Sequence, residues 1–201
     1  MEGGDTGLSY ETASKERASI VVRAGLEEGF TFSCRRCALC CSTGPNVTLT
    51  VFDVVRLARH LNINPLVFLR VYAKVVIADY IPVVALQGDF KGRCVFLGLD
   101  KEAAYCKVYD CRPARCRLYP LKPISPSSTF LELDEKCPGW YKSPASRTLV
   151  APEEYARYAT EVKEHYKTLW YRIFEKGEDP VTALYNTIRH VAEQVKNSAT
   201  E

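Results

Sequence analysis

The sequence predicts an α+β fold, in which a small cysteine-rich domain of short strands and irregular loops is flanked by helices and by a C-terminal helical hairpin. Three observations predict it. Apolar residues recur at helical spacing between Val51 and Tyr72. The content of β-branched residues rises between Val75 and Leu99, which indicates one or two short strands. The last quarter of the chain contains no cysteine and has a strongly helical pattern.

Local capping signals place the helices of the first half. Thr50 is a good N-cap, and Asp53, three residues later, gives an imperfect capping box for the first helix. Asn64 caps a second helix that has Pro65 at its first position, where the missing N–H has no partner to lose. A further short strand is expected from Thr129 to Leu133.

The last quarter is expected to form two helices. Pro152 opens one that ends at Gly177, and Asp179 with Pro180 caps the other. The short link between them predicts an antiparallel hairpin. The first of these helices is rich in aromatic residues, which are interpreted as core rather than as a stacking platform for bases: Tyr155, Tyr158, Tyr166, Trp170 and Tyr171.

These elements divide the chain into three parts. Residues 1–30 form an N-terminal tail with a short apolar segment, residues 31–145 a cysteine-cluster domain, and residues 146–201 the hairpin packed on it. Charged residues are 25% and hydrophobic residues 47%, as in an ordinary globular protein. The chain therefore has the composition of a folded domain with its own core.

Four of the nine cysteines occupy one short run, Cys34-Arg-Arg-Cys37-Ala-Leu-Cys40-Cys41. Ferredoxin-type iron–sulfur clusters use three cysteines at this spacing together with a remote fourth thiolate, and structural zinc uses C-x2-C pairs. Four cysteines so close together are not explained as filling of an apolar core. The run therefore predicts a metal centre, with iron–sulfur favoured over zinc and disulfides kept as a third alternative.

A cytoplasmic location is expected. The first ten residues have no apolar region of the kind found in signal peptides, and the most apolar stretch, Val75 to Leu86, is too short to span a membrane. Thiols stay reduced in the cytosol, and an odd number of cysteines argues against a pure disulfide framework. The net charge of +3 does not support a nucleic-acid partner, because two four-thiolate centres would reverse its sign.

The remaining cysteines extend the pattern. C-x-F-L begins at Cys94, and C-x-x-Y follows at Cys106. R-P-x-x-C-R-x-Y-P then surrounds Cys116. Together with the run, these motifs resemble the YkgJ-type cysteine-cluster family, which is described as chelating zinc or iron and is related to the flagellin lysine-methylase proteins. The resemblance spans about Phe32 to Trp140, and within it the order of Tyr105 to Trp140 is expected to come mainly from metal.

The resemblance implies which residues hold the metal. Eight cysteines fall on the family's cysteine positions: Cys34, Cys37, Cys40, Cys41, Cys94, Cys106, Cys116 and Cys137. Cys111 falls on a position that the family leaves free and is expected to be the odd thiol. Arg112 and Arg117 belong to the motif, and are expected to bind the cofactor by offsetting its negative charge.

How the cysteines divide between centres is left open. Successive side chains diverge, so Cys40 and Cys41 are expected to point to different places. One arrangement puts Cys34, Cys37 and Cys40 on one cluster with a remote thiolate, for which Cys137 is a candidate. The three histidines, all on expected helices, are predicted to be surface or capping residues rather than ligands: His60, His165 and His190.

The predicted function is that of a cytoplasmic protein with one or two thiolate-ligated metal centres, either [4Fe–4S] clusters or zinc, and an unidentified redox or protein partner. The first hypothesis is a redox or catalytic role. The alternative is a structural zinc module that presents its helices to a protein partner. No independent catalytic constellation is present, so an iron–sulfur oxidoreductase and a protein-modifying enzyme both stay open, the latter by analogy alone.

Overall fold

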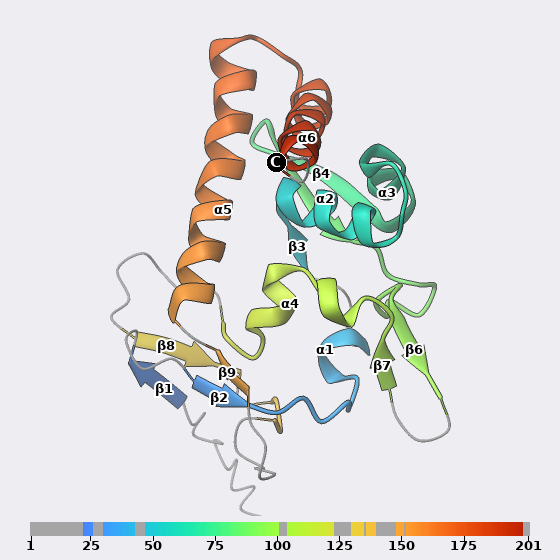
Figure 1. Ribbon diagram of the computed structural model, residues 1–201, viewed down its shortest axis with the longest axis vertical. Helices are drawn as coiled ribbons and strands as arrows, with labels where there is room; N and C mark the ends of the chain where they lie inside the picture. The colour runs from blue at the N-terminus through green and yellow to red at the C-terminus, as the bar shows by residue number, and fades with distance from the viewer. Residues whose placement is uncertain are drawn as a thin grey trace, which may run out of the picture.

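The computed structural model describes residues 22–25, 30–42, 47–100, 104–122, 130–134, 136–139, 148–150 and 152–198. It confirms the α+β fold, because short antiparallel strands are combined with helices (Figure 1). The two C-terminal helices stand at one end of the molecule and the cysteine-bearing loops lie at the other. No helix in the described part of the chain is long and apolar enough to cross a membrane.

The capping signals of the first half are confirmed. Helix α2 (Val51–His60) begins after Thr50, whose hydroxyl accepts from the Asp53 amide while the Asp53 carboxylate accepts from the Thr50 amide. The capping box that looked imperfect is therefore complete. Helix α3 (Pro65–Tyr72) begins after Asn64, which accepts from the Leu66 amide at 2.8 Å.

A three-stranded antiparallel sheet, with strand order β3-β5-β4, is formed by one strand before these helices and two strands after them. Strands β4 (Ala73–Ala78) and β5 (Ile81–Leu86) form a hairpin whose two turn residues have positive φ. The short strand β3 (Thr48–Leu49) pairs with the other edge of β5. The expected strands are thus present, and they begin two residues earlier than the sequence pattern indicated.

Three two-stranded antiparallel sheets hold the cysteine-rich part. Their pairs are β1 (Val22–Gly25) with β8 (Phe130–Leu133), β2 (Phe30–Phe32) with β9 (Thr148–Val150), and β6 (Leu97–Leu99) with β7 (Ala104–Cys106). The short helices α1 (Leu39–Ser42) and α4 (Ala114–Leu118) and a 3₁₀ turn lie between them. The strand expected before residue 134 is confirmed as β8. The division of the chain at residues 30 and 145 stays a prediction, and strand pairs cross both boundaries.

The C-terminal helices form the expected antiparallel pair. Helix α5 (Pro152–Trp170) continues as a π-helical turn over Tyr171–Glu175, and α6 (Pro180–Asn197) begins after Asp179, which accepts from the two amides that follow Pro180. Buried side chains of both helices join the core that α2, α3 and β5 form. The hairpin therefore covers the central helices, as Figure 1 shows.

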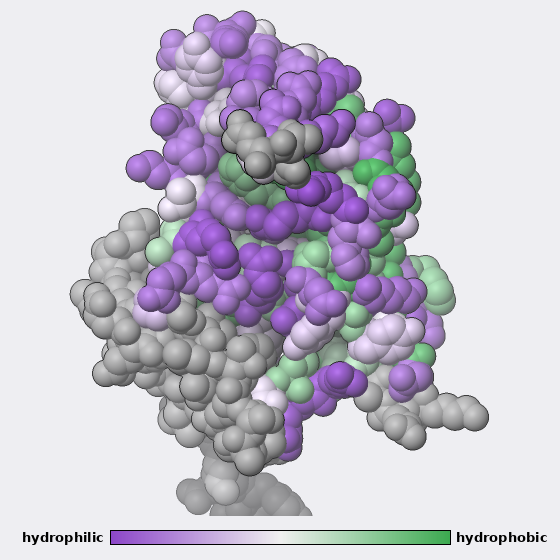
Figure 2. All heavy atoms as spheres, in the orientation of Figure 1, coloured by the Kyte–Doolittle hydropathy of each residue, from purple (hydrophilic) through white to green (hydrophobic). Residues whose placement is uncertain are grey.

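The interpretation of the α5 aromatics as core residues is wrong for three of them. Tyr166, Trp170 and Tyr171 are between 42% and 51% exposed. The buried positions are instead His165, Leu169 and Ile173, because only one stripe of the helix faces α2 and α6. Figure 2 shows hydrophilic residues over much of the outer surface of this hairpin.

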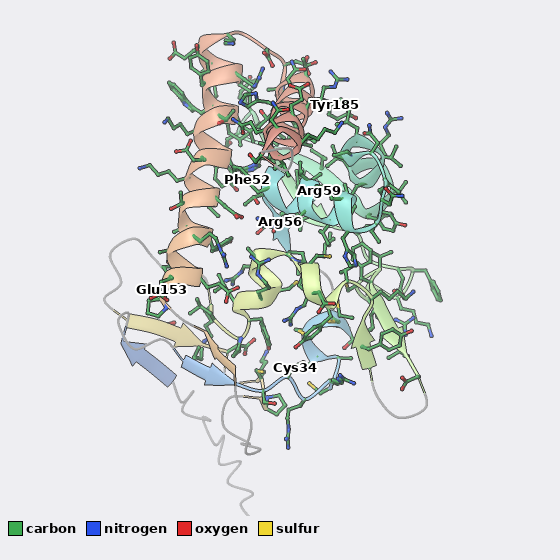
Figure 3. All side chains as sticks on the ribbon, viewed as in Figure 1. Cys34, Phe52, Arg56, Arg59, Glu153 and Tyr185 are labelled. Carbon is green, nitrogen blue, oxygen red and sulfur yellow. The ribbon has the colours of Figure 1, made fainter. Side chains whose placement is uncertain are left out.

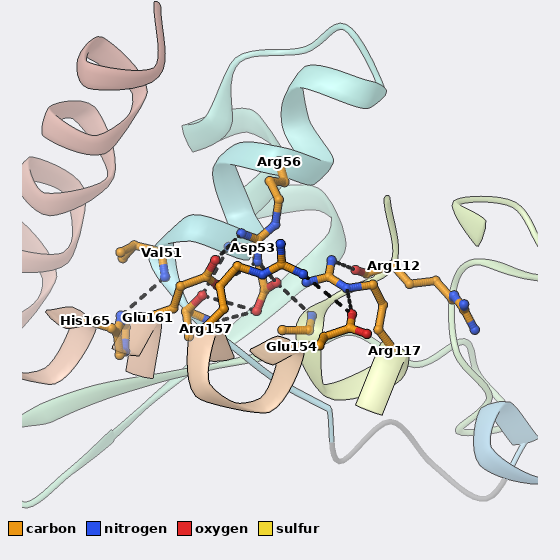
Figure 4. A network of polar contacts seen from close by, with 11 residues as sticks. Val51, Asp53, Arg56, Arg112, Arg117, Glu154, Arg157, Glu161 and His165 are labelled. Carbon is orange, nitrogen blue, oxygen red and sulfur yellow. Dashed lines mark hydrogen bonds and ion pairs between the residues drawn. The ribbon is translucent and has the colours of Figure 1, made fainter. Parts of the chain in front are cut away.

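A buried polar network joins the hairpin to both halves of the chain (Figure 4). The Asp53 side chain has no exposed surface and accepts from the Ala114 amide at 2.9 Å, at the first residue of α4. It also pairs with Arg56, whose guanidinium binds both carboxylate oxygens of Glu161 on α5 at 2.6 and 2.8 Å. One carboxylate therefore fixes α2, α4 and, through Arg56, α5.

His165 has one of the roles expected of the histidines. Its Nδ1 accepts from the Val51 amide at 3.3 Å, so it caps α2 from a different helix. Burial lowers the pKa of His165 to about 4, and the Asp53 carboxylate opposes this effect only in part. His60 and His190 are exposed on α2 and α6. His165 is therefore a neutral, buried capping residue.

The variant Asp53→Asn is expected to destabilise the protein by about 2–3 kcal/mol, because it leaves the Arg56 charge without its buried partner and weakens two helix caps. Denaturant unfolding measures this loss. Asp79→Asn is the control, since Asp79 is exposed in a turn at φ 48, a conformation that asparagine accepts. Equal stability of Asp53→Asn and the control would contradict the structural role of Asp53.

The buried His165 predicts a loss of stability at acid pH. The unfolded histidine takes up a proton near pH 6.5, whereas the folded one does so only near pH 4. Its contribution is therefore present above pH 6.5 and is lost as the pH falls to about 4, by about 3 kcal/mol. Unfolding free energies across this window measure the effect.

The variant His165→Gln keeps an oxygen that can accept from Val51 but does not titrate, so its stability should fall less between pH 6.5 and 4. Its control is His60→Gln, which removes an exposed histidine and should retain the wild-type slope. Asp53 and the edge of the Tyr166 ring face His165 and are the same in all three proteins. Parallel curves for wild type and His165→Gln would show that His165 is not the group responsible.

Candidate metal centre

Eight of the nine cysteines line one cavity of about 610 Å³. They are the eight that the motif positions indicate: Cys34, Cys37, Cys40, Cys41, Cys94, Cys106, Cys116 and Cys137. They come from five segments of the chain, namely the run, the turn before β6, the end of β7, α4 and the loop after β8. Figure 3 shows Cys34 on the loop that leads into α1, with further sulfur atoms nearby.

Two backbone hydrogen bonds fix the ends of the cysteine run. At its start, the Ser33 amide donates to the Gly139 carbonyl at 3.0 Å, which places the run beside the loop of Cys137. At its end, the Cys94 amide donates to the Cys41 carbonyl at 2.7 Å. Between them, Arg36 and Ala38 have positive φ, an uncommon conformation that reverses the chain around the thiols.

The β6–β7 hairpin brings Cys94 and Cys106 together. The Leu97 amide donates to the Cys94 carbonyl, and Leu97 is also the register partner of Cys106. A side chain at Gly98 would force the Tyr105 ring to move, because a Cβ there would collide with it. The Tyr105 ring in turn lines the cavity beside Cys106.

Cys116 lies in α4, whose first amide binds Asp53. The buried network therefore sets the position of this thiol from a point far away in the sequence. Sequence analysis missed this role of Asp53, since no local signal links residues that are 61 positions apart.

The sulfurs of Cys40 and Cys41 lie 3.6 Å apart, at hydrogen-bonding distance. The expectation that these two side chains point to different places is therefore wrong. Both line the same cavity from the single turn of α1. The hydrogen bond with Cys40 and, to a smaller extent, the Arg112 charge together lower the pKa of Cys41 to about 7, against the effect of burial. The same bond, together with burial, raises the pKa of Cys40 strongly.

Ionisation of three further cavity thiols is opposed by burial and by their neighbours. Burial is the first cause that raises the pKa of Cys94, Cys106 and Cys116, and the charges of neighbouring thiolates raise it further. A bound metal supplies the positive charge that allows such a group to ionise together, with release of protons. The cavity therefore has the chemistry of a site completed by a cation.

Arg112 and Arg117 take different positions. Arg112 lines the cavity, with its guanidinium 3.8 Å from the centre of the Tyr109 ring and its Nε donating to the Tyr109 carbonyl. Arg117 is absent from the described lining; it donates to Glu154 and to the backbone carbonyl of Arg112. In this arrangement Arg112 brings charge to the thiols, while Arg117 holds the backbone of Arg112.

Further polar and charged side chains line the cavity beside the cysteines and Arg112. Tyr119 donates to Asp134 at 3.2 Å, and burial raises its pKa, with the charges of Asp134 and Cys137 adding to the effect. Tyr119 is the tyrosine of the R-x-Y-P motif, so the sequence contained a signal for it. Four further cations line the cavity: Arg35, Arg36, Arg115 and Lys136.

Cys111 differs from the other eight cysteines in its position. It is not among the described residues that line the cavity, and its thiol donates to the Val108 carbonyl at 3.6 Å. Like Cys94 and Cys106, it packs against the hydrophobic core, and the charge of Cys106 acts on it. That Cys111 is no ligand stays a prediction.

The donor set fits a thiolate-bound metal. No histidine is found among the described lining residues, and Asp134 is their one carboxylate. Within the described ranges, no three His, Cys, Asp or Glu side chains converge on a point that could hold a single ion. The sulfurs of Cys40 and Cys41, 3.6 Å apart, have about the spacing of two thiolate ligands of one zinc, whose sulfurs lie about 4 Å apart. The lining therefore suits a metal held by thiolates.

Comparison with known proteins agrees with this chemistry. Residues 33–138 match the family model described as "CxxCxxCC: Putative zinc- or iron-chelating domain". An uncharacterized protein from Methanocaldococcus jannaschii is 30% identical over 156 residues, which cover 75% of each chain. No solved structure matches the chain.

Proposed function

The chain belongs to the CxxCxxCC family of zinc- or iron-chelating domains, and from this premise we propose that it is an iron–sulfur protein with a redox role. Eight thiolates would hold [4Fe–4S] clusters in the cavity. One observation carries the proposal: the eight motif cysteines line one cavity, and the ninth cysteine is not among its described lining residues. Chance burial of cysteines would not separate them in this way.

Iron–sulfur is favoured over zinc by the form of the donor set. Eight thiols and no described histidine line the cavity, and three of the thiols have the spacing of a ferredoxin run. A cluster contributes its own sulfides and spans a wider ring of cysteines than one ion does, in agreement with thiols that do not converge on a point. Zinc would require the same thiols to close around one atom at each site.

The surrounding residues support a redox role. A cluster, when bound, supplies a one-electron couple whose potential depends on nearby charge, hydrogen bonds and solvent. Arg112 brings a fixed positive charge beside Cys41 and Cys106, and cations near a cluster favour its reduced form. Thiol ligation also requires a reducing compartment, so we place the protein in the cytoplasm.

The first test compares Cys116→Ser with Cys111→Ser in protein purified without air. Wild type should contain iron and sulfide in equal amounts and absorb visible light. Cys116→Ser should lose about half of its iron or more, because one ligand of four is lost from a cluster. Cys111→Ser is the matched control, since Cys111 is a half-buried thiol outside the cavity, and it should keep the wild-type content.

Elemental analysis for iron, sulfide and zinc is the measurement. A colourless wild-type protein with stoichiometric zinc and no iron would overturn the proposal. It would favour the alternative of a zinc module that holds the loops in place and presents the C-terminal hairpin to a protein partner. Equal losses of iron in Cys111→Ser and Cys116→Ser would overturn the assignment of the ligands.

A further inference from the structure

We propose that the eight cavity thiolates form two centres of four, an inner and an outer one, and that only the outer centre is open to reactants. The inner group is Cys41, Cys94, Cys106 and Cys116. The outer group is Cys34, Cys37, Cys40 and Cys137. This inference rests on the proposed function for the identity of the metal, but the division of the thiols follows from their placement.

Backbone contacts define the inner group. The Cys94 amide binds the Cys41 carbonyl at 2.7 Å, and the Lys107 amide next to Cys106 binds the Phe96 carbonyl in the segment that follows Cys94. Cys116 lies in α4, which is fixed on Asp53 and lines the same cavity. The segment of Cys94 is thus tied to the last cysteine of the run, and the segment of Cys106 is tied to that of Cys94.

The charges of the thiolates support this group. Cys41 and Cys106 act on Cys94, and Cys41 acts on Cys106. Cys41, Cys94 and Cys106 all act on Cys116. Every pair within the inner group therefore interacts, and the charge of Cys34 from the outer group also acts on Cys106.

The outer group is tied to the start of the run. The hydrogen bond from Ser33 to Gly139 brings the loop of Cys137 beside Cys34. The charges of Cys37 and Cys34 are the thiolate charges that act on Cys137, and that of Cys34 also acts on Cys40. Three thiols of the run and one remote cysteine followed by proline are also the ligand pattern of a ferredoxin cluster.

The two groups meet at the doublet of adjacent cysteines, Cys40 and Cys41. Cys40 interacts with Cys34 of the outer group and with Cys116 of the inner group, and its sulfur lies 3.6 Å from that of Cys41. Each group needs a fourth ligand, and the assignment of one member of the doublet to each gives both groups four. The two centres then lie side by side within one cavity.

Exposure distinguishes the two centres. Three members of the outer group are exposed, namely Cys34, Cys37 and Cys40, and the fourth, Cys137, is buried; the inner group has no exposed member. Arg35 and Arg36, between the outer thiols, are also exposed. The inner centre therefore has the position of a structural centre that joins the loops to the core, and the outer centre that of a reactive one.

The test follows the release of iron to a ferrous chelator from anaerobic protein. Wild type, with about eight iron atoms per chain, should release about half rapidly and the rest at least about ten times more slowly. Cys37→Ser should keep about half of the iron and lose the rapid phase. It should keep most of its thermal stability, because the inner centre is intact.

Cys94→Ser should lose the slow phase and much of its stability. If it does not fold, Cys37→Ser and wild type still decide the question. Cys111→Ser is the control and should show both phases. A single release phase in wild type, or complete loss of iron from a folded Cys37→Ser, would overturn the division into two centres.

The same measurements distinguish an error in the iron–sulfur assignment from an error in the division of the thiols. If wild type contains about two zinc ions and no iron, and Cys37→Ser retains one of them, the iron–sulfur assignment is wrong but the division of the thiols is upheld. If iron and sulfide are present but every cavity variant loses all of both, the division is wrong and the iron–sulfur assignment is upheld.

Discussion

The structure depends on the gathering of eight thiols from five segments into one cavity. Burial and mutual repulsion oppose the ionisation of most of these thiols, so a protein that holds them together needs positive charge among them. Arginines and a lysine on the lining supply part of this charge. Metal cations supply the rest, and the free energy of their binding then contributes to the folding of the loops.

The helical part of the molecule provides the fixed frame for these loops. Its core consists of α2, α3, β5 and the hairpin of α5 and α6, and it contains no cavity cysteine. The connection between frame and loops is the buried carboxylate of Asp53, which holds the first turn of α4 and is itself held by Arg56. Cys116 thus takes its position from a residue of the frame.

The sequence predicted what local chemistry determines. The caps at Thr50, Asn64 and Asp179 need only neighbouring residues, and all three are formed. The family resemblance implied that Cys111 is the odd thiol, and it is not among the described residues that line the cavity. By contrast, the His165 cap of α2 and the Asp53 cap of α4 join residues far apart in the chain, so no pattern in either segment could indicate them.

Two other features could not be read from periodicity. The α5 aromatics have helical spacing, but exposure depends on which stripe meets the neighbouring helices, and Trp170 faces away from them. The sulfurs of Cys40 and Cys41 were expected to diverge, yet the single turn of α1 brings both to the cavity. In each case, the packing of distant segments decided the outcome.

The central claim is that the cavity thiols hold iron–sulfur clusters. Electron paramagnetic resonance of the unmodified protein, purified without air and then reduced, tests it most directly. We expect a signal of reduced iron–sulfur clusters that disappears on reoxidation, in protein that stays folded. A protein that contains stoichiometric zinc and gives no signal after reduction would contradict the account.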